Sequence, residues 1–284
     1  INGTGAALSF TGIFRFSGRA SQTITSAGKV WPGPLWIDSP GGTVTLQDAF
    51  SCSFANNGAF NLAKGAFNAN NYNVTLTGTN STVSITGTNT RTLAMGSGTW
   101  LIGSSFSIPW DASSSAGLTV TGTGVISLTS ASSKTFAGGG VQTYPTLNQG
   151  GTGTLTVSGS NKFAGLTNTA IGRIQFTGGT TNEFTSFSIN GTAGNLLPLG
   201  SSNTTQAILK RPSDWNVGAN STDAGNNTGL SFTAGSNDYL SVSYINGQIA
   251  APASTIYYGA TNITNIRFGS AAVSAVYYGS TKVF

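Results

Sequence analysis

The sequence predicts an all-β protein: a β-solenoid of the parallel β-helix type with a small β-hairpin module at its C-terminus. Three observations support this prediction. A short phrase of alternating apolar and polar residues recurs along the chain, a glycine closes each copy, and a different repeat occupies residues 256–284. Each coil of a solenoid buries its apolar side only against its neighbours, so repetition at a roughly constant spacing is typical of this architecture.

The recurring phrase alternates apolar and small polar residues, which is typical of a strand with one buried face. The copies lie at 74–78, 83–87, 118–122, 155–159, 174–178 and 187–191. The closing glycines at 87, 122, 159 and 178 define three intervals. The first two are each close to twice the length of the third. They predict a coil of about 18 residues. The shorter steps from 78 to 87 and from 178 to 191 predict two strands within one coil.

The composition favours a folded β protein. Charged residues make up only 7% of the chain, against roughly 25% in an ordinary soluble domain. The chain has 40 glycines, but it also has 16 Phe, 8 Tyr and 5 Trp, and disordered chains lack such aromatic residues. No apolar pattern recurs at the helical period of 3.6, and no apolar run reaches the ~18 residues of a membrane span.

The few charges and the single cysteine limit the partners. The net charge of +5 is spread along the chain, with only Lys210 and Arg211 adjacent, so we expect no nucleic-acid partner. Cys52 lies between Phe50 and Phe54, and we expect a buried, unreactive thiol. Since the numbering starts at Ile1, either processing removed the start or the numbering begins inside a longer product.

The predicted organisation has three parts. Residues 1–50 form an N-terminal cap or attachment segment, in which Trp31 and Trp36 flank two prolines and cover one end of the stack or contact a partner. Residues 51–250 form the solenoid shaft, with a loop-rich region at 200–238 and Asn-rich corners that suit left-handed turns. We expect the regularly spaced phenylalanines to stack in its core: Phe60, Phe67, Phe106, Phe136, Phe163, Phe176 and Phe184.

Residues 251–284 form the third part, in which a strand, a glycine turn and a strand recur every ten residues. An isolated hairpin is marginal in water, so this module must pack on the solenoid or on another subunit. Its aromatic residues are therefore the candidate assembly contacts: Tyr257, Tyr258, Phe268, Tyr277 and Tyr278.

The titratable residues argue against catalysis. The chain has no His, which excludes Ser-His-Asp chemistry and His-containing metal sites. Cleavage of a polysaccharide normally requires two carboxylates in one groove, and only Asp214, Asp223 and Asp238 form a plausible set. Turn-capping aspartates explain this set equally well. We therefore predict no catalytic residue, no enzyme activity and no cofactor.

The loop-rich region carries two candidate binding sites. Asp223, Asn226 and Asn227 offer oxygen ligands for calcium, but a single carboxylate is weak charge for a divalent ion, so no metal site is predicted. Trp215, Asn226, Asn227 and Tyr239 combine aromatic faces with amide groups, as glycan or receptor binding requires. The alternative is that Trp215 plugs the end of the solenoid.

Several motifs resemble β-repeat proteins encoded by tailed phages of marine bacteria and cyanobacteria. The resemblance covers roughly residues 55–284 and is carried by residues 133–140, 144–148, 155–161, 184–193 and 276–283. Residues 223–229 are similar to an Asp-Gly-Gly-Asn-Asn-Thr-Gly-Trp phrase of such repeats, with Leu230 where Trp is common. The resemblance implies a virion component, either a tail fibre, a spike or a capsid-attached fibre.

The expected function is therefore that of a non-enzymatic phage virion structural protein, a fibre or spike component for host adhesion. Its partners would be other virion proteins, a host-surface glycan or receptor, and copies of itself. A closed ring of identical subunits is expected, and the resemblance implies a trimer. The alternatives are a capsid-bound decoration protein, a polysaccharide depolymerase spike and a secreted bacterial adhesin.

Overall fold

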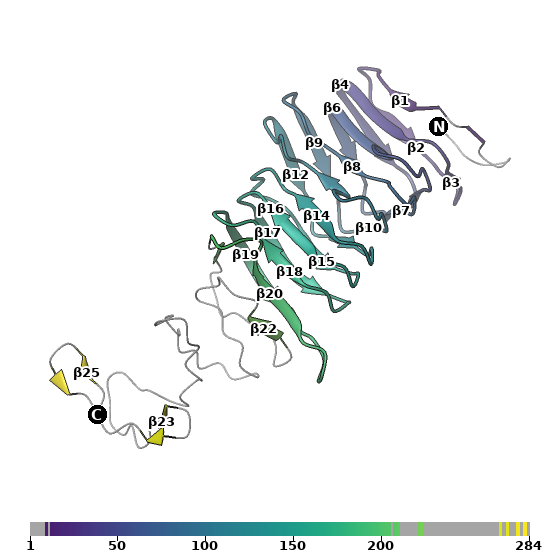
Figure 1. The fold of residues 1–284 in the computed structure, drawn as a ribbon. Coiled ribbons are helices and arrows are strands. Elements are labelled where there is room, and N and C mark those ends of the chain that lie inside the picture. Colours follow the sequence, from purple (N-terminus) through teal and green to yellow (C-terminus); the bar gives the residue numbers. More distant parts are fainter. Residues whose placement is uncertain are drawn as a thin grey trace.

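The computed structural model describes residues 9–205 except 11, residues 207–210, and five short strands further along the chain. The described part is all-β, and its parallel strands stack along one axis as a β-solenoid of about eight turns (Figure 1). The predicted fold class is confirmed. No helix capable of spanning a membrane occurs among these residues.

Two large parallel sheets form the solenoid. The nine-stranded sheet contains β3 (Val30–Trp31), β5 (Phe50–Cys52), β7 (Val74–Leu76), β10 (Thr99–Ile102), β13 (Val125–Leu128), β15 (Thr146–Gln149), β17 (Lys162–Asn168), β19 (Thr181–Ser188) and β21 (Ile208–Lys210). The thirteen-stranded sheet contains β1 (Phe14–Phe16), β2 (Gln22–Ile24), β4 (Leu35–Leu46), β6 (Phe60–Asn68), β8 (Val83–Ser84), β9 (Arg91–Ala94), β11 (Trp110–Asp111), β12 (Leu118–Thr121), β14 (Lys134–Ala137), β16 (Leu155–Ser158), β18 (Ile174–Phe176), β20 (Leu197–Ser201) and β22 (Ser221–Asp223).

The coil length changes along the axis. Ile102 pairs with Leu128 and Val157 pairs with Phe176, so the later coil takes fewer residues to return to the same face. The early coils are longer because they contain a third face, made by β2, the second halves of β4 and β6, and then β9 and β12. Among the described residues no later strand continues this face. The predicted unit of about 18 residues therefore fits the coils near residue 160 and is wrong for the earlier ones.

The copies of the recurring phrase occupy different faces. The copy at 74–78 begins with β7 in the nine-stranded sheet, and the copy at 83–87 begins with β8 in the thirteen-stranded sheet. The copy at 174–178 contains β18 and the copy at 187–191 contains the end of β19, again in different sheets. The prediction that these closely spaced copies are two strands of one coil is confirmed.

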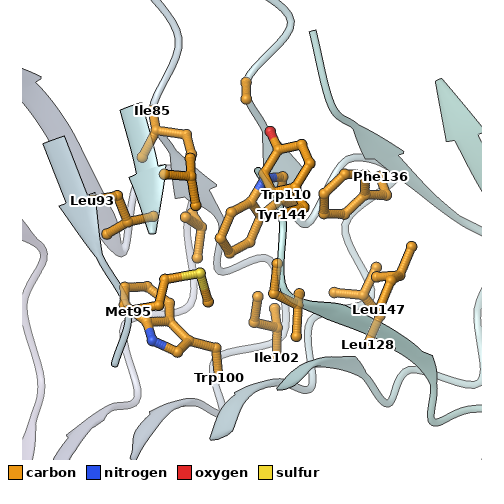
Figure 2. Packing of buried hydrophobic residues seen from close by; sticks show 14 of the residues in the cluster. Ile85, Leu93, Met95, Trp100, Ile102, Trp110, Leu128, Phe136, Tyr144 and Leu147 are labelled. Carbon is orange, nitrogen blue, oxygen red and sulfur yellow. The ribbon is translucent and has the colours of Figure 1, made fainter. Parts of the chain in front are cut away.

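A column of buried side chains fills the solenoid and includes many aromatic rings. Ring contacts follow one another from Phe60 through Trp100 and Trp110 to Phe136, with centroids 5.3 to 6.0 Å apart. Figure 2 shows the middle of this column, where Trp110 lies beside Tyr144 and Phe136. The predicted core phenylalanines are buried except Phe106, which is only half-buried. Cys52 is also buried, as predicted, and burial raises the pKa of its thiol.

Parallel pairing begins within the segment expected to cap the solenoid. β1 pairs with β4 and β3 with β5, so residues 14–52 contribute strands to the same two sheets as the shaft. Trp31 is buried and its ring contacts Phe14 and Phe50, whereas Trp36 points outward from β4. Pro32 and Pro34 lie in the turn between β3 and β4, so neither of these two prolines interrupts a strand.

The long strands β4 and β6 turn a corner at a bulge. The register shifts between Ile37 and Thr43, at the Pro-Gly-Gly run that β4 contains. A proline fits a strand at such a site because no ladder hydrogen bond is required of it. The predicted left-handed Asn corners are also present, since Asn70 and Asn71 have φ of 51° and 65°.

We predict that Gly65→Ala, in β6, destabilises the protein far more than Gly41→Ala on the neighbouring coil. Both glycines have positive φ, 80° and 77°, so both variants carry backbone strain. A Cβ at Gly65 would also collide with the Ser39 carbonyl oxygen, whereas nothing lies within 4 Å of one at Gly41. We expect the free energy of unfolding to fall by about 2 kcal/mol more for Gly65→Ala. Urea denaturation measures both variants, and equal losses would contradict the packing argument.

Two short antiparallel pairs are described in the C-terminal region. β23 (Arg267–Phe268) pairs with β24 (Ala271–Ala272), and β25 (Tyr277–Tyr278) pairs with β26 (Thr281–Lys282). These pairs confirm the strands predicted on either side of the glycine in the second and third tail units, and the turns between them lie outside the described residues. The domain boundaries at 50 and 250 stay predictions.

Candidate functional site

The carboxylates of the described coils each have a structural role. Asp48 accepts hydrogen bonds from the backbone N–H groups of Ser26 and Ala27 at 2.7 and 2.6 Å, which fixes a corner of the neighbouring coil. Asp111 accepts from the N–H and the hydroxyl of Ser113. Within the described residues no three His, Cys, Asp or Glu side chains form a group that could hold a metal ion.

The other two carboxylates form surface ion pairs. Glu183 lies 2.6 Å from the Lys162 ammonium, on adjacent coils. Asp38 lies 3.0 Å from the Arg15 guanidinium and 3.8 Å from the Lys64 ammonium. These pairs bridge successive coils, and exposed pairs of this kind contribute little to stability.

The glycan and calcium candidates of the loop-rich region fall outside the described residues. This applies to Trp215, Asn226, Asn227 and Tyr239, and to the carboxylates Asp214 and Asp238. The backbone of Asp223 ends β22, where it pairs with Leu199 of β20. For the candidate assembly residues, the backbones of Phe268, Tyr277 and Tyr278 belong to the hairpin strands, and Tyr257 and Tyr258 lie outside the described residues. All of these assignments stay predictions.

The structure contains an open groove that sequence reasoning missed. It has a volume of about 350 Å³ and lies where β4 and β6 bend from one face of the thirteen-stranded sheet to the next. Its lining comes from three successive coils: residues 40–43, residues 64–66, and Asn89, Thr90 and Thr92. Because coils stack along the solenoid axis, the groove runs across coils rather than along a strand.

Small polar residues line the groove, and charged residues lie at one side of it. Thr43, Ala66 and Thr92 share one outward row, since Thr43 pairs with Ala66 and Ala66 with Thr92. Lys64 is part of the lining and faces Asp38, which also holds Arg15. The Arg15 guanidinium carbon lies 5.5 Å from the centre of the Trp36 ring. The lining itself offers hydroxyl groups and one cation, and Trp36 lies outside it.

A signal for this groove exists in the sequence. The run from Pro40 to Gly42 interrupts the alternation of apolar residues between Ile37 and Val44. Glycine inside a strand pattern often marks a bulge or a close backbone approach. The signal locates the bend, but it does not show that Lys64 and Thr92 from later coils meet there.

Two buried cations lie at corners without a carboxylate partner. Arg91 is fully buried, and its guanidinium donates to the carbonyl oxygens of Asn89, Gly87 and Ala116 at 3.0, 2.6 and 2.8 Å and to that of Ile85. These carbonyls belong to two successive coils, so Arg91 joins their corners. Its alternation with Leu93, two residues later, was the sequence signal for burial.

Lys134 has a similar position at the start of β14. Its ammonium donates to the carbonyl oxygens of Ser130 and Gly153 at 2.9 and 3.2 Å, and the residue is only 2% exposed. Desolvation disfavours the charged form and lowers the pKa of Lys134 to about 8. The alternation with Phe136, two residues later, again places it on the inner side.

This shifted pKa predicts that stability rises with pH in a defined window. Between about pH 8 and 10.5 the unfolded chain holds the Lys134 proton and the folded chain does not, so the free energy of unfolding rises with pH. From pH 7.5 to 9 the gain is on the order of 1 kcal/mol. Urea denaturation at the two pH values measures it. The same gain in Lys134→Met would show that another group is responsible.

Comparison with protein-family models, with curated proteins and with solved structures finds no match for this chain. The class is therefore defined by the fold itself. The chain belongs to the β-solenoid proteins, with a polar groove across its early coils and buried cations at its corners.

Proposed function

We propose that this chain is a non-enzymatic structural protein of a phage virion, a fibre or spike component that holds the particle to its host. The observation that carries the proposal is the unbroken parallel pairing from β3 to β21, which forms a solenoid suited to act as a spacer. Strands β14, β16 and β19 contain part of the motifs that resemble phage β-repeat proteins.

The pairing explains why such a protein can act as a shaft. Each interior strand bonds to the coil before and the coil after it, and the side chains between the sheets form one continuous core. In repeat proteins of this kind each coil contacts only the neighbouring coils, so the solenoid can be lengthened by further coils without a change in its core packing. The carboxylates of the described coils are hydrogen-bonded or ion-paired within the solenoid, which supports a role without catalysis.

The proposed assembly is a homotrimer within the virion. Identical subunits close most simply by rotation. The number three comes only from the resemblance to phage β-repeat proteins. Sedimentation equilibrium of the purified chain tests this, with an expected mass near three times 28.8 kDa. A monomer across the concentration range would contradict it.

Immunogold labelling of purified particles tests the virion role. We expect antibody raised against this chain to label the tail fibres or spikes. Label distributed over the capsid shell would identify a decoration protein, and particles without label would contradict a virion role. Incubation with host capsular polysaccharide is the matching test of the absence of enzyme activity. Shorter fragments in the product would identify a depolymerase.

A further inference from the structure

From the groove in the early coils we infer a binding site for a short segment of an acidic polysaccharide, held without cleavage. The inference deepens the adhesive role proposed above and rests on it. The occupant lies along the solenoid axis across β4, β6 and the start of β9, with Lys64 opposite its carboxylate or sulfate groups.

The dimensions fit a linear chain rather than a compact molecule. Three coils separated by the usual strand spacing span about 10 Å, which matches a short stretch of linked sugar rings. The groove is open, so a long polymer passes through it and continues on either side. Of the three glycines in the lining, only Gly41 faces open space, where a Cβ would meet nothing within 4 Å. The glycines at 42 and 65 instead allow close packing at the bend, since a Cβ on either would collide with Ser39.

The lining has the chemistry of a sugar site. Thr43, Thr90 and Thr92 provide hydroxyl groups, and Asn89 provides an amide, so the groove both donates and accepts hydrogen bonds. Trp36 does not line the groove, but it projects from the same side of β4 as Asp38 and contacts Arg15, which shares that carboxylate with Lys64. Aromatic rings with polar neighbours suit the mixed surface of a sugar ring.

The charge at the rim selects an acidic polymer. Lys64 and Arg15 share the single carboxylate of Asp38, which leaves one positive charge in excess. The backbone oxygen of Arg19 lies beside Gly42, so the segment that carries this exposed residue runs next to the groove. No carboxylate lines the groove itself, and glycoside cleavage requires two. The lining therefore provides groups that bind the polymer and no carboxylate pair for its hydrolysis.

Calorimetric titration at low salt tests the site. The probes are an alginate oligosaccharide, as a polyuronate, and a neutral dextran oligosaccharide of equal length. We expect measurable binding of alginate only, and weaker binding at high salt. Lys64→Gln should weaken it about fivefold, as expected for one unit charge at about 4 Å in water. Ala66→Phe should abolish binding because the ring fills the groove.

Matched controls make the result specific. Lys162 is as exposed as Lys64, at 44%, and also pairs with a carboxylate, so Lys162→Gln should bind like the wild type. Ala94→Phe introduces the same ring on β9 outside the groove and should also bind normally. Circular dichroism establishes that each variant is folded, and Lys64→Gln carries the test if Ala66→Phe does not fold.

Three outcomes would overturn the inference: no binding of alginate, equal binding of dextran, or unchanged binding by Lys64→Gln. Equal, Lys64-dependent binding of single-stranded DNA would also overturn it, because the groove would then read charge and not sugar. Label on the fibres without alginate binding would refute this site and leave the virion role standing. Alginate binding by a chain that is absent from particles would do the reverse.

Discussion

Replacement of Trp110 with alanine is expected to lower the free energy of unfolding by about 3–5 kcal/mol. The indole is fully buried, stacks on Phe136 at 5.5 Å between centroids and contacts Trp100 and Tyr144 at 6.0 and 6.1 Å. Its removal leaves a cavity in the middle of the column, and the stacked strands on both sides cannot collapse into it without losing their register. Urea denaturation followed by far-ultraviolet circular dichroism measures the loss.

Trp36 provides the matched control for Trp110. It is the same residue type, but it points outward from β4 and contacts Arg15 through its ring. Its replacement with alanine should therefore cost about 1 kcal/mol or less. Similar losses for the two variants would show that the aromatic column is not the main source of stability. A transition that splits into two steps for Trp110→Ala would show that the coils on either side unfold separately.

Arg91→Met is expected to cost about 3 kcal/mol or more, although methionine is an apolar residue entering a buried position. The guanidinium satisfies carbonyl oxygens from two corners, at Gly87 and at Ala116 among others. Removing the donor leaves buried acceptors without partners, and each costs about 1–3 kcal/mol. Burial lowers the pKa of Arg91, yet arginine stays charged across the physiological range.

Arg91→Lys separates charge from geometry. Lysine keeps the positive charge but cannot bridge as many carbonyls, so we expect an intermediate loss of stability. Lys64→Met is the surface control, since it removes an exposed cation and should change stability by less than about 1 kcal/mol. Thermal or urea unfolding compares the three variants. If Arg91→Lys proved as damaging as Arg91→Met, the charge would contribute little and the bridging geometry would explain the whole effect.

The solenoid was predictable because its signal is local. Alternation within each phrase places Val74 and Leu76 inward, and a glycine turns the chain after each strand. The hairpins of the tail were predictable for the same reason. The buried cations follow from the same alternation, since Arg91 and Lys134 stand two residues before Leu93 and Phe136. They were not predicted as core residues because charged side chains are rarely buried.

The third face and the groove were not predictable from these patterns. Strands β8 and β9 carry similar alternation. However, β8 pairs with β11, whereas β9 pairs with β12 on the third face, and only these partners distinguish the two strands. Lys64 and Thr92 line the same groove because β4 and β6 bend at a bulge, and the local sequence does not specify which later residues lie beside that bend. A site assembled from several coils has no sequence spacing of its own.

Local sequence patterns are enough to establish an all-β solenoid with a buried aromatic column, because period-two alternation and glycine turns act over short stretches of chain. Only the packing of coils on one another establishes the length of each coil, the extent of the third face, and which distant residues share the groove. Those features depend on pairing between strands that lie a whole coil apart in the sequence, as Val157 with Phe176 and Val83 with Trp110. The register of such pairs is set by packing between whole coils and not by any one phrase.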